Sequence, residues 1–252
     1  MRRNNNRNTW EDNPEKNIFI FDVDGTLTPP NKPMDIQFMR WFELWMLKPS
    51  ISVVFCTNNT FESISERMGR KIIEQSRAVF TCGGNEVYTN KKKIALNNWR
   101  PTPELIQFLD QVVKKSEFKT RSGPNFEYRT GMVSFSVLGK TANDEDREKY
   151  KRWDQQTKER IRTVKLLKEK FPDLCICKSG DTSIDISNGD KSQILKYFTD
   201  TQNLWFFGNE FEMDGNDISI KLSLEKNNNR RYTIKHVHND QETFSTLRKL
   251  TI

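Results

Sequence analysis

Short apolar runs alternate with amphipathic segments through the first third of the chain. Three of these runs are predicted strands, at about residues 18–21, 51–56 and 78–80. Residues 34–47 place apolar side chains at roughly helical spacing, and a second helix is expected up to about Ser76, with Thr60 or Asn59 as its N-cap. This alternation of strand, loop and helix is typical of a parallel, doubly wound sheet.

The pattern changes between about Lys91 and Ile186. The strands expected here look antiparallel, and they lie at residues 126–129, 132–138, 173–177 and 182–186. A Thr130-Gly131 turn joins the first two of them. Two helices accompany the strands, at about residues 103–115 and 144–170, and the second is charged on most faces. The segment is therefore predicted to be an α+β domain inserted into the first domain.

The first pattern resumes after residue 187. Asp190 can be the N-cap of a helix, with Gln193 as the reciprocal partner in a capping box. Two more strands, at about residues 204–207 and 232–237, and a last helix complete the chain. The predicted fold is α/β, with a doubly wound parallel-sheet (Rossmann-like) core and an inserted α+β cap. The expected division is a disordered tail at 1–16, a core at 17–90 and 187–252, and the cap at 91–186.

Polar side chains follow the predicted core strands where these strands end. Asp22 and Asp24 follow the first strand, and Thr57 follows the second. Asn209 and Asp217 come after a later one. The carboxyl ends of parallel strands meet along one edge of a sheet, so these side chains are expected to lie close together. Two acids two residues apart can divide the chemistry, one as a nucleophile and one in proton transfer. A solvated Asp-x-Asp-Gly turn is the alternative reading.

Lys191 lies in the first turn of the helix expected after the inserted segment. The helix dipole disfavours a cation at this place, so the lysine is either a chance surface residue or a group that points at a phosphate. Transfer through an aspartyl-phosphate needs an attacking carboxylate, a hard cation, and a lysine and a hydroxyl that hold the phosphate. Mg²⁺ takes oxygen ligands of the kind that these strand ends supply.

The composition narrows the class of protein. Only 35% of the 252 residues are apolar and the mean hydropathy is −0.80, so a charged surface is expected. No apolar run approaches the roughly 20 residues of a membrane span, and no apolar segment follows the N-terminal charges as in a secretory signal. Four cysteines are too few for a disulfide scaffold in a chain of this length. A reducing, cytoplasmic compartment is therefore expected.

The positive charge is concentrated in the middle of the chain. The net charge is +7; residues 92–185 hold 20 Lys/Arg against 14 Asp/Glu, and the remainder holds 21 against 20. An electropositive middle segment suits an anionic partner, which could be a phosphorylated small molecule or a nucleic acid.

Motifs in the core and the middle segment resemble a known family. The motifs at Asp22, Thr57, Lys191 and residues 208–217, in that order, are similar to those of the haloacid dehalogenase (HAD) superfamily of phosphotransferases. The middle of the chain resembles one branch, the eukaryotic-type phosphomannomutases. The segments that carry the resemblance are FDVDGTLTP at 21–29, FEYRTGM at 126–132, GDKS at 189–192, FFGNE at 206–210 and GND at 215–217.

The resemblance implies a role for each candidate residue in the core. Asp22 would carry the phosphoryl group, Asp24 would be the acid and base for the sugar hydroxyl, and Thr57 and Lys191 would complete the catalytic group. Mg²⁺ would be bound by Asp22, the Asp24 carbonyl and Asn209, a position where aspartate is usual, and the metal set would also include Asp217.

The resemblance also implies a substrate site in the cap. Arg129, Lys140 and Arg147 would hold the distal phosphate, although a generic basic face is the alternative reading of these cations. Lys140 takes the place of an arginine. A single ammonium charge therefore replaces a guanidinium that could bind a phosphate through two hydrogen bonds. Ser183 and Asp185 would contact sugar hydroxyls.

Two positions depart from the mutase pattern. Asn31 takes the place of an arginine that contacts the substrate, and Lys32 could partly compensate. Ser219 takes the place of a glutamate, which argues against a second cation site.

Three functions are compared. The first is a phosphomannomutase that interconverts mannose 6-phosphate and mannose 1-phosphate, and the second is a Mg²⁺-dependent HAD phosphatase whose cap admits water. The third is an inactive scaffold whose basic cap binds nucleic acid, but no stacking aromatic motif is interleaved with the basic residues. The expected partner is a phosphorylated hexose, without nucleic acid or membrane. The resemblance suggests a homodimer formed through the cap.

Overall fold

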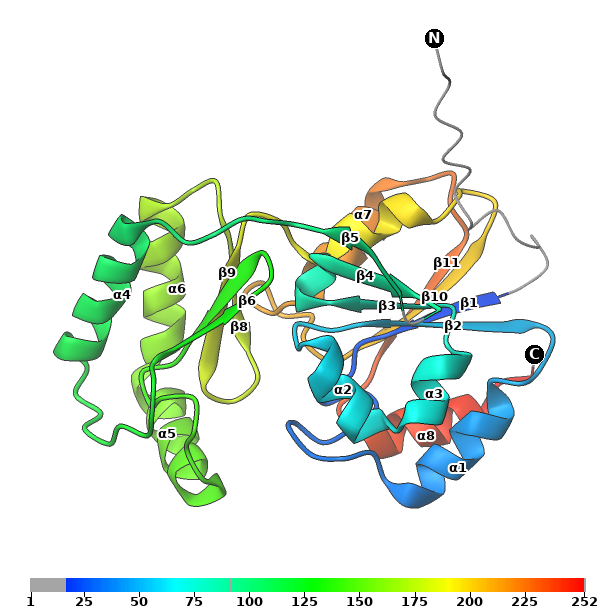
Figure 1. The fold of residues 1–252 in the computed structure, drawn as a ribbon, viewed down its shortest axis with the longest axis horizontal. Coiled ribbons are helices and arrows are strands. Elements are labelled where there is room, and N and C mark those ends of the chain that lie inside the picture. Colours follow the sequence, from blue (N-terminus) through cyan, green and yellow to red (C-terminus); the bar gives the residue numbers. More distant parts are fainter. Residues whose placement is uncertain (1–16, 91, 252) are drawn as a thin grey trace, which may run out of the picture.

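The structure is a computed structural model that describes residues 17–90 and 92–251, so the expected tail at 1–16 lies outside the described residues. A seven-stranded sheet and a four-stranded sheet each carry their own helices, and two segments of chain connect them (Figure 1). The predicted fold class, an α/β core with an inserted α+β cap, is confirmed. Within the described residues, no helix has the length and apolar character that a membrane crossing requires.

The larger sheet forms the core. Its strands, in spatial order, are β11 (Tyr232–His236), β10 (Asn203–Gly208), β1 (Asn17–Phe21), β2 (Ile51–Cys56), β3 (Ala78–Thr81), β4 (Glu86–Thr89) and β5 (Lys92–Leu96). The first five run parallel, and β4 and β5 are antiparallel to their neighbours. The chain therefore leaves the core after Leu96, and the boundary expected at residue 91 falls inside a hairpin of the core sheet. Strand β5 is mostly exposed, so it lacks the apolar run that predicted the five parallel strands, and β4 was not predicted either.

Both faces of the core sheet are buried under helices. Helices α1 (Ile36–Trp45), α2 (Phe61–Met68), α3 (Arg70–Gln75) and α8 (Asp240–Lys249) cover one face, and the 3₁₀ helix η2 (Lys191–Tyr197) and α7 (Ile218–Lys226) cover the other (Figure 1). Phe19 and Phe21 pack under the first group, whereas Ile18 and Ile20 pack under the second. A central parallel strand buried on both sides reads as a continuous apolar run, which is why β1 could be predicted.

The smaller sheet forms the cap. Its strand order is β6 (Phe126–Arg129), β7 (Met132–Phe135), β9 (Ser183–Ser187) and β8 (Cys175–Ser179), all antiparallel. Helices α4 (Pro103–Lys115), α5 (Asp144–Thr157) and α6 (Glu159–Lys170) lie on the side away from the core (Figure 1). The face under these helices is apolar, whereas the opposite face pairs Glu127 with Ser134 and Ser134 with Asp185. The cap therefore presents a polar sheet face to the core.

Two predicted helices are each divided into two. The helix expected up to Ser76 breaks at Gly69, where φ is +82°, and the helix expected at 144–170 breaks at Lys158, where φ is 58°. Helical periodicity continues across both breaks, so the pattern of apolar positions does not reveal them.

The capping box predicted at Asp190 is only half correct. The Asp190 side chain accepts from the backbone N–H of Ser192 at 2.8 Å, as an N-cap does. Gln193 does not return a bond to the cap. Its amide donates to the Gly83 carbonyl at 2.8 Å and to Asn85 Oδ1 at 3.2 Å. Gln193 therefore ties η2 to the loop after β3 and does not stabilise its own helix end.

Candidate active site

Strand β1 ends in a turn that depends on glycine. The backbone N–H of Asp22 donates to the Phe207 carbonyl of β10 at 2.9 Å, which keeps the residue in register with the sheet edge. Gly25 has a φ of +80°, and a Cβ at this position would collide with the side chain of Asn209. Both the turn and the close approach of Asn209 thus require glycine. The turn places the end of β1 directly against the loop that follows β10.

Asp22, Lys191 and Asp217 form a buried charged cluster. Lys191 Nζ donates to Asp22 Oδ1 at 2.6 Å and to Asp217 Oδ1 at 2.8 Å. The three residues are 4%, 2% and 0% exposed, so each charge depends on these partners. The other oxygen of Asp217 accepts the backbone N–H groups of Asn209 and Glu210, both at 3.0 Å. The structure therefore brings together groups that lie 169 and 26 residues apart in the chain.

The surroundings of this cluster shift the pKa values of its members. Burial raises the pKa of Asp22 to about 8, although the charge of Lys191 acts in the opposite direction. Burial acts against the charge of Lys191, but Asp217 and Asp22 outweigh it and raise the pKa of the lysine well above its usual range. The lysine is therefore permanently cationic. A second cation beside Asp22 would favour its ionised, nucleophilic form.

The amide of Asn209 lies against three oxygen atoms. One of its terminal atoms is 3.3 Å from Asp22 Oδ2, 3.1 Å from the Asp24 carbonyl and 3.3 Å from Thr26 Oγ1. If that atom is nitrogen, the amide can donate to all three. If it is oxygen, it accepts from Thr26 Oγ1 at 3.3 Å and converges with the oxygens of Asp22 and Asp24, an arrangement that a cation between them would stabilise. Carboxylate, carbonyl and amide oxygens are ligands that Mg²⁺ accepts, so these residues fit the ion.

No cluster of acidic, histidine or cysteine side chains in the described part of the chain forms a metal site by itself. Any cation at Asp22 would therefore depend on the main-chain oxygen of Asp24 and on the neutral amide of Asn209. Such a site carries less negative charge than one in which aspartate occupies position 209.

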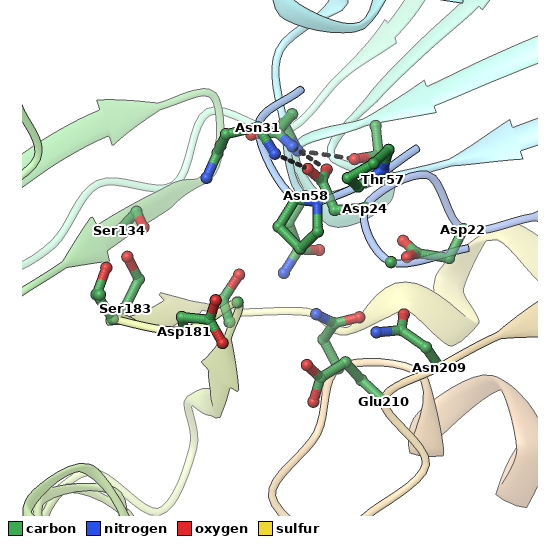
Figure 2. A pocket seen from close by; sticks show the side chains of 18 of the residues that line it. Asp22, Asp24, Asn31, Thr57, Asn58, Ser134, Asp181, Ser183, Asn209 and Glu210 are labelled. Atoms are coloured by element: carbon green, nitrogen blue, oxygen red, sulfur yellow. Dashed lines mark hydrogen bonds between the residues drawn. The ribbon is translucent and has the colours of Figure 1, made fainter. Parts of the chain in front are cut away.

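Asp24 points away from Asp22 and is held by donors on both oxygens. Oδ1 accepts from the backbone N–H of Asn31 at 2.9 Å and from Arg67 Nη1 at 2.6 Å. Oδ2 accepts from Asn59 Nδ2 at 2.5 Å and from Arg67 Nη2 at 3.2 Å. Figure 2 shows Asp24 beside Asn31, across the opening from Asn209. Arg67 was not among the predicted site residues, because nothing in the pattern of α2 distinguishes it from a surface arginine.

The loop after β2 supplies Thr57 and two asparagines. Thr57 is 1% exposed, and its hydroxyl accepts the backbone N–H of Asn59 at 3.1 Å. Of the two N-caps considered for α2, Thr60 caps the helix through the backbone N–H of Ser63, and Asn59 reaches Asp24 instead. Asn59 thus links Thr57 to Asp24.

The cap contributes three cations and a carboxylate. Arg129 donates through Nε and Nη2 to the two oxygens of Glu127, both at 2.7 Å, and Lys140 Nζ lies 3.4 Å from Glu127 Oε2. Lys140 also donates to Ser134 at 2.9 Å and to Ser183 at 3.0 Å. The predicted phosphate-binding cations are therefore close together, and Glu127, which has no role in the sequence analysis, is their counterion.

Arg147 lies at the end of this group, in α5. Its guanidinium donates to the Ala142 carbonyl at 3.0 Å, and to Thr182 Oγ1 and the Lys140 carbonyl at 3.3 Å. It is therefore held mainly by uncharged acceptors, so its charge is available to an anionic ligand.

The Glu127 contacts predict a pH dependence of stability. Burial acts to raise the pKa of Glu127, but Arg129 and Lys140 outweigh it and lower this pKa from 4.5 to about 2. The ionised Glu127 therefore makes its full contribution to the free energy of unfolding above about pH 4.5, and this contribution is lost as the pH falls toward 2. We expect Glu127→Gln to flatten the decline of the unfolding free energy over this window, measured by urea denaturation at stepped pH. An unchanged slope would contradict the ion pairs described.

Asn58 connects the core to the cap. Its Nδ2 donates to Asp185 Oδ2 at 2.7 Å, and its carbonyl accepts from Arg129 Nη1 at 2.7 Å. Asp185 is 2% exposed, and its Oδ1 has no donor among the described residues. The position after Thr57 thus binds two of the predicted substrate residues when no ligand is present.

A cavity of about 330 Å³ lies between the core edge and the cap face. Asp22, Asp24, Thr57 and Asn209 line it from the core, and Ser183 lines it from the cap (Figure 2). Arg129, Lys140 and Arg147 also line it from the cap. Lys191 and Asp185 border instead a second, wider cavity of about 610 Å³ behind the first. Asp217 borders neither. The arrangement places a nucleophile and a cation cradle opposite a group of cations, as transfer within a doubly anionic substrate requires.

The chain is similar in sequence to known phosphomannomutases. The family described as eukaryotic phosphomannomutase matches residues 41–251. The chain is 29% identical over 213 residues to a phosphomannomutase of Dendrobium officinale, which covers 81% of this chain and 84% of that protein. It is 28% identical over 216 residues to one of Spinacia oleracea, covering 82% and 86%.

Solved structures show the same fold. The C-terminal domain of C. albicans trehalose-6-phosphate phosphatase aligns with a TM-score of 0.62 at 15% identity, covering 92% of this chain and 91% of that chain. The Synechocystis sucrose-phosphatase aligns at 0.52 and 13% identity, covering 94% and 100%. At this level of identity the likeness establishes the fold, and nothing about the substrate.

Proposed function

Because the chain belongs to the eukaryotic phosphomannomutase family, we propose that it interconverts mannose 6-phosphate and mannose 1-phosphate, with the phosphoryl group carried on Asp22. The chain is an enzyme of the HAD phosphotransferase class. The observation that carries the proposal is the buried Asp22–Lys191–Asp217 cluster. Of its three members, Asp22 borders the cavity that has Arg129 on its opposite wall.

The two acids of the β1 turn divide the chemistry. In the first half of the cycle the Asp22 carboxylate forms a bond to phosphorus while the bond from phosphorus to the sugar oxygen breaks. Asp24 gives its proton to that oxygen. To carry this proton, the Asp24 carboxylate must first open one of the four hydrogen bonds that it accepts from Arg67, Asn59 and the Asn31 N–H. In the second half a sugar hydroxyl gives its proton to Asp24 and attacks the phosphorus, and Asp22 leaves as a carboxylate. The proton and the phosphoryl group are both conserved over the cycle, so no free phosphate is produced.

The other residues hold charge and exclude water. Lys191 and the Thr57 hydroxyl neutralise the phosphoryl oxygens near Asp22, and Arg129, Lys140 and Arg147 hold the second phosphate of a bisphosphate intermediate. Ser183 contacts sugar hydroxyls, and Asp185 does so once a ligand displaces Asn58. The cap closes over the site and keeps water from the aspartyl-phosphate.

Mg²⁺ is the metal proposed, held by Asp22, the Asp24 carbonyl and Asn209. When bound, it neutralises charge on the phosphoryl oxygens. Both oxygens of Asp217 already accept hydrogen bonds within the protein. We therefore assign Asp217 to holding Lys191 and the 209–210 backbone, in place of the direct ligand role expected from the sequence.

Because the Asn209 side chain is a neutral amide, the metal site is expected to be weak, and replacing Asn209 with aspartate should strengthen it. Asn209→Asp adds a negative charge beside Asp22 and the Asp24 carbonyl, so the Mg²⁺ concentration for half-maximal activity should fall about tenfold, which corresponds to about 1.4 kcal/mol. The measurement is a Mg²⁺ titration of initial rates after chelation of the protein with EDTA. An unchanged midpoint would mean that position 209 does not face the cation.

One assay distinguishes the mutase from the phosphatase alternative. The protein is incubated with mannose 1-phosphate, Mg²⁺ and a sugar bisphosphate activator, and both mannose 6-phosphate and free phosphate are measured. The expected result is the isomer without stoichiometric phosphate. Stoichiometric phosphate without the isomer would contradict the mutase proposal and favour the phosphatase.

A cap-mediated homodimer is part of the proposal. Tyr128, Ile161 and Leu166 expose 56%, 44% and 52% of their surface on the cap, although they are large apolar side chains. Light scattering should give about twice the chain mass of 29.8 kDa.

All four cysteines are free, which supports the reducing, cytoplasmic location expected from the sequence.

A further inference from the structure

Arg67 is a largely buried arginine whose two terminal nitrogens both bind one acid, Asp24. Its side chain is 10% exposed and that of Asp24 is 22% exposed. Nη1 and Nη2 bind one oxygen each of Asp24, and Nε donates to the Ser63 carbonyl at 3.3 Å within α2. The fork of an arginine matches a carboxylate in both position and orientation, so this contact fixes the plane of the acid as well as its place.

The same arginine anchors the segment around Asp24 through its backbone. The Arg67 carbonyl accepts the backbone N–H of Met34 at 3.0 Å, and Asn31, three residues earlier, donates its own N–H to Asp24. Helix α2 thus holds both Asp24 and the loop beside it. Asn59 holds Asp24 from the other side.

Arg67 does not border the cavity of the active site, whereas Asp24 does. A substrate in that cavity would therefore meet the acid and not the arginine. Any effect of Arg67 on the reaction must then pass through Asp24.

We infer that Arg67 is the positioning residue for proton transfer by Asp24, an inference that rests on the role proposed above for Asp24. The acid must meet the oxygen of the departing sugar at hydrogen-bond distance while the bond to phosphorus breaks. A displacement of about 1 Å can cost on the order of 10²-fold in rate. The side-chain torsions of Asp24 are held by four hydrogen bonds, and Arg67 supplies two of them, one to each oxygen.

The test compares leaving groups that do and do not need a proton. A sugar alkoxide must be protonated as it departs, whereas p-nitrophenolate departs without a proton. We expect Arg67→Gln to lower kcat for mannose 1-phosphate about 10²-fold with KM nearly unchanged. Release of p-nitrophenolate from p-nitrophenyl phosphate should stay within a few-fold of wild type. Arg67→Lys keeps the charge without the fork and should recover only a small part of the loss.

Arg230→Gln is the matched control. Arg230 is also buried, with 7% of its side chain exposed, and it pairs with Asp200 at 2.9 Å away from the cavity. Arg230→Gln should lower the unfolding midpoint, but it should not change the ratio of the rates with mannose 1-phosphate and p-nitrophenyl phosphate.

The outcomes distinguish this inference from the proposed function. Equal losses of Arg67→Gln on both substrates, or no loss on either, would overturn the positioning role while the mutase assignment stands. The same holds if Arg67→Lys is fully active. If wild-type protein transfers no phosphoryl group from either substrate, the proposed function fails, and this inference fails with it.

Discussion

Asp22→Asn should abolish phosphoryl transfer, with a loss on the order of 10⁴-fold or more. The amide cannot attack phosphorus, and it offers the cation one neutral oxygen in place of a carboxylate. The measurement is incorporation of labelled phosphate into the protein from a sugar bisphosphate, together with the rate of isomer formation. Label on the variant at the wild-type level would show that another residue is the nucleophile.

The same substitution should leave the fold intact or more stable. Lys191 keeps Asp217 as its partner at 2.8 Å, so no buried cation is left alone. Burial raises the pKa of Asp22 from 3.8 to about 8, so the metal-free folded state holds a proton that the unfolded state releases. Wild-type stability should therefore fall as the pH rises from about 4 to 8, and Asp22→Asn should remove this fall. Thermal unfolding of both proteins in EDTA at stepped pH is the check.

Lys191→Met should affect both catalysis and stability. The shape of the side chain is roughly kept, but Asp22 and Asp217 are left as neighbouring buried acids without their shared cation. Breaking a buried ion pair in this way costs about 3–5 kcal/mol. The phosphoryl oxygens also lose a positive charge, which lowers kcat about 10²–10³-fold.

Two measurements separate these effects of Lys191→Met. Denaturant unfolding at two pH values gives the change in the free energy of unfolding. Initial rates measured at denaturant concentrations well below the unfolding midpoint give the change in kcat. A variant that folds like wild type and keeps a tenth or more of its kcat would contradict the place given to Lys191.

Several features of the fold followed from local patterns. The apolar run of β1 is recognisable because central parallel strands bury both faces, and the polar residues after β1, β2 and β10 mark the sheet edge. The separation of core and cap was visible in the change from regular alternation to antiparallel strands. The boundary at 91 was misplaced because β5 is exposed and joins the core only through pairing with β4.

The sequence by itself determined the doubly wound core, the inserted cap, and the acids and lysine of the candidate site, because strand periodicity and strand-end chemistry are local properties. The individual cap cations were expected only from the resemblance of the cap motifs to the mutase family. Only the tertiary structure decided how these groups are held. Arg67 reaches Asp24 across 43 residues, and Asn58 reaches Asp185 across 127. Such contacts leave no periodic trace in the chain. These contacts depend on how helices and loops pack against one another. Only the tertiary structure therefore identifies the residues that hold the catalytic groups in place.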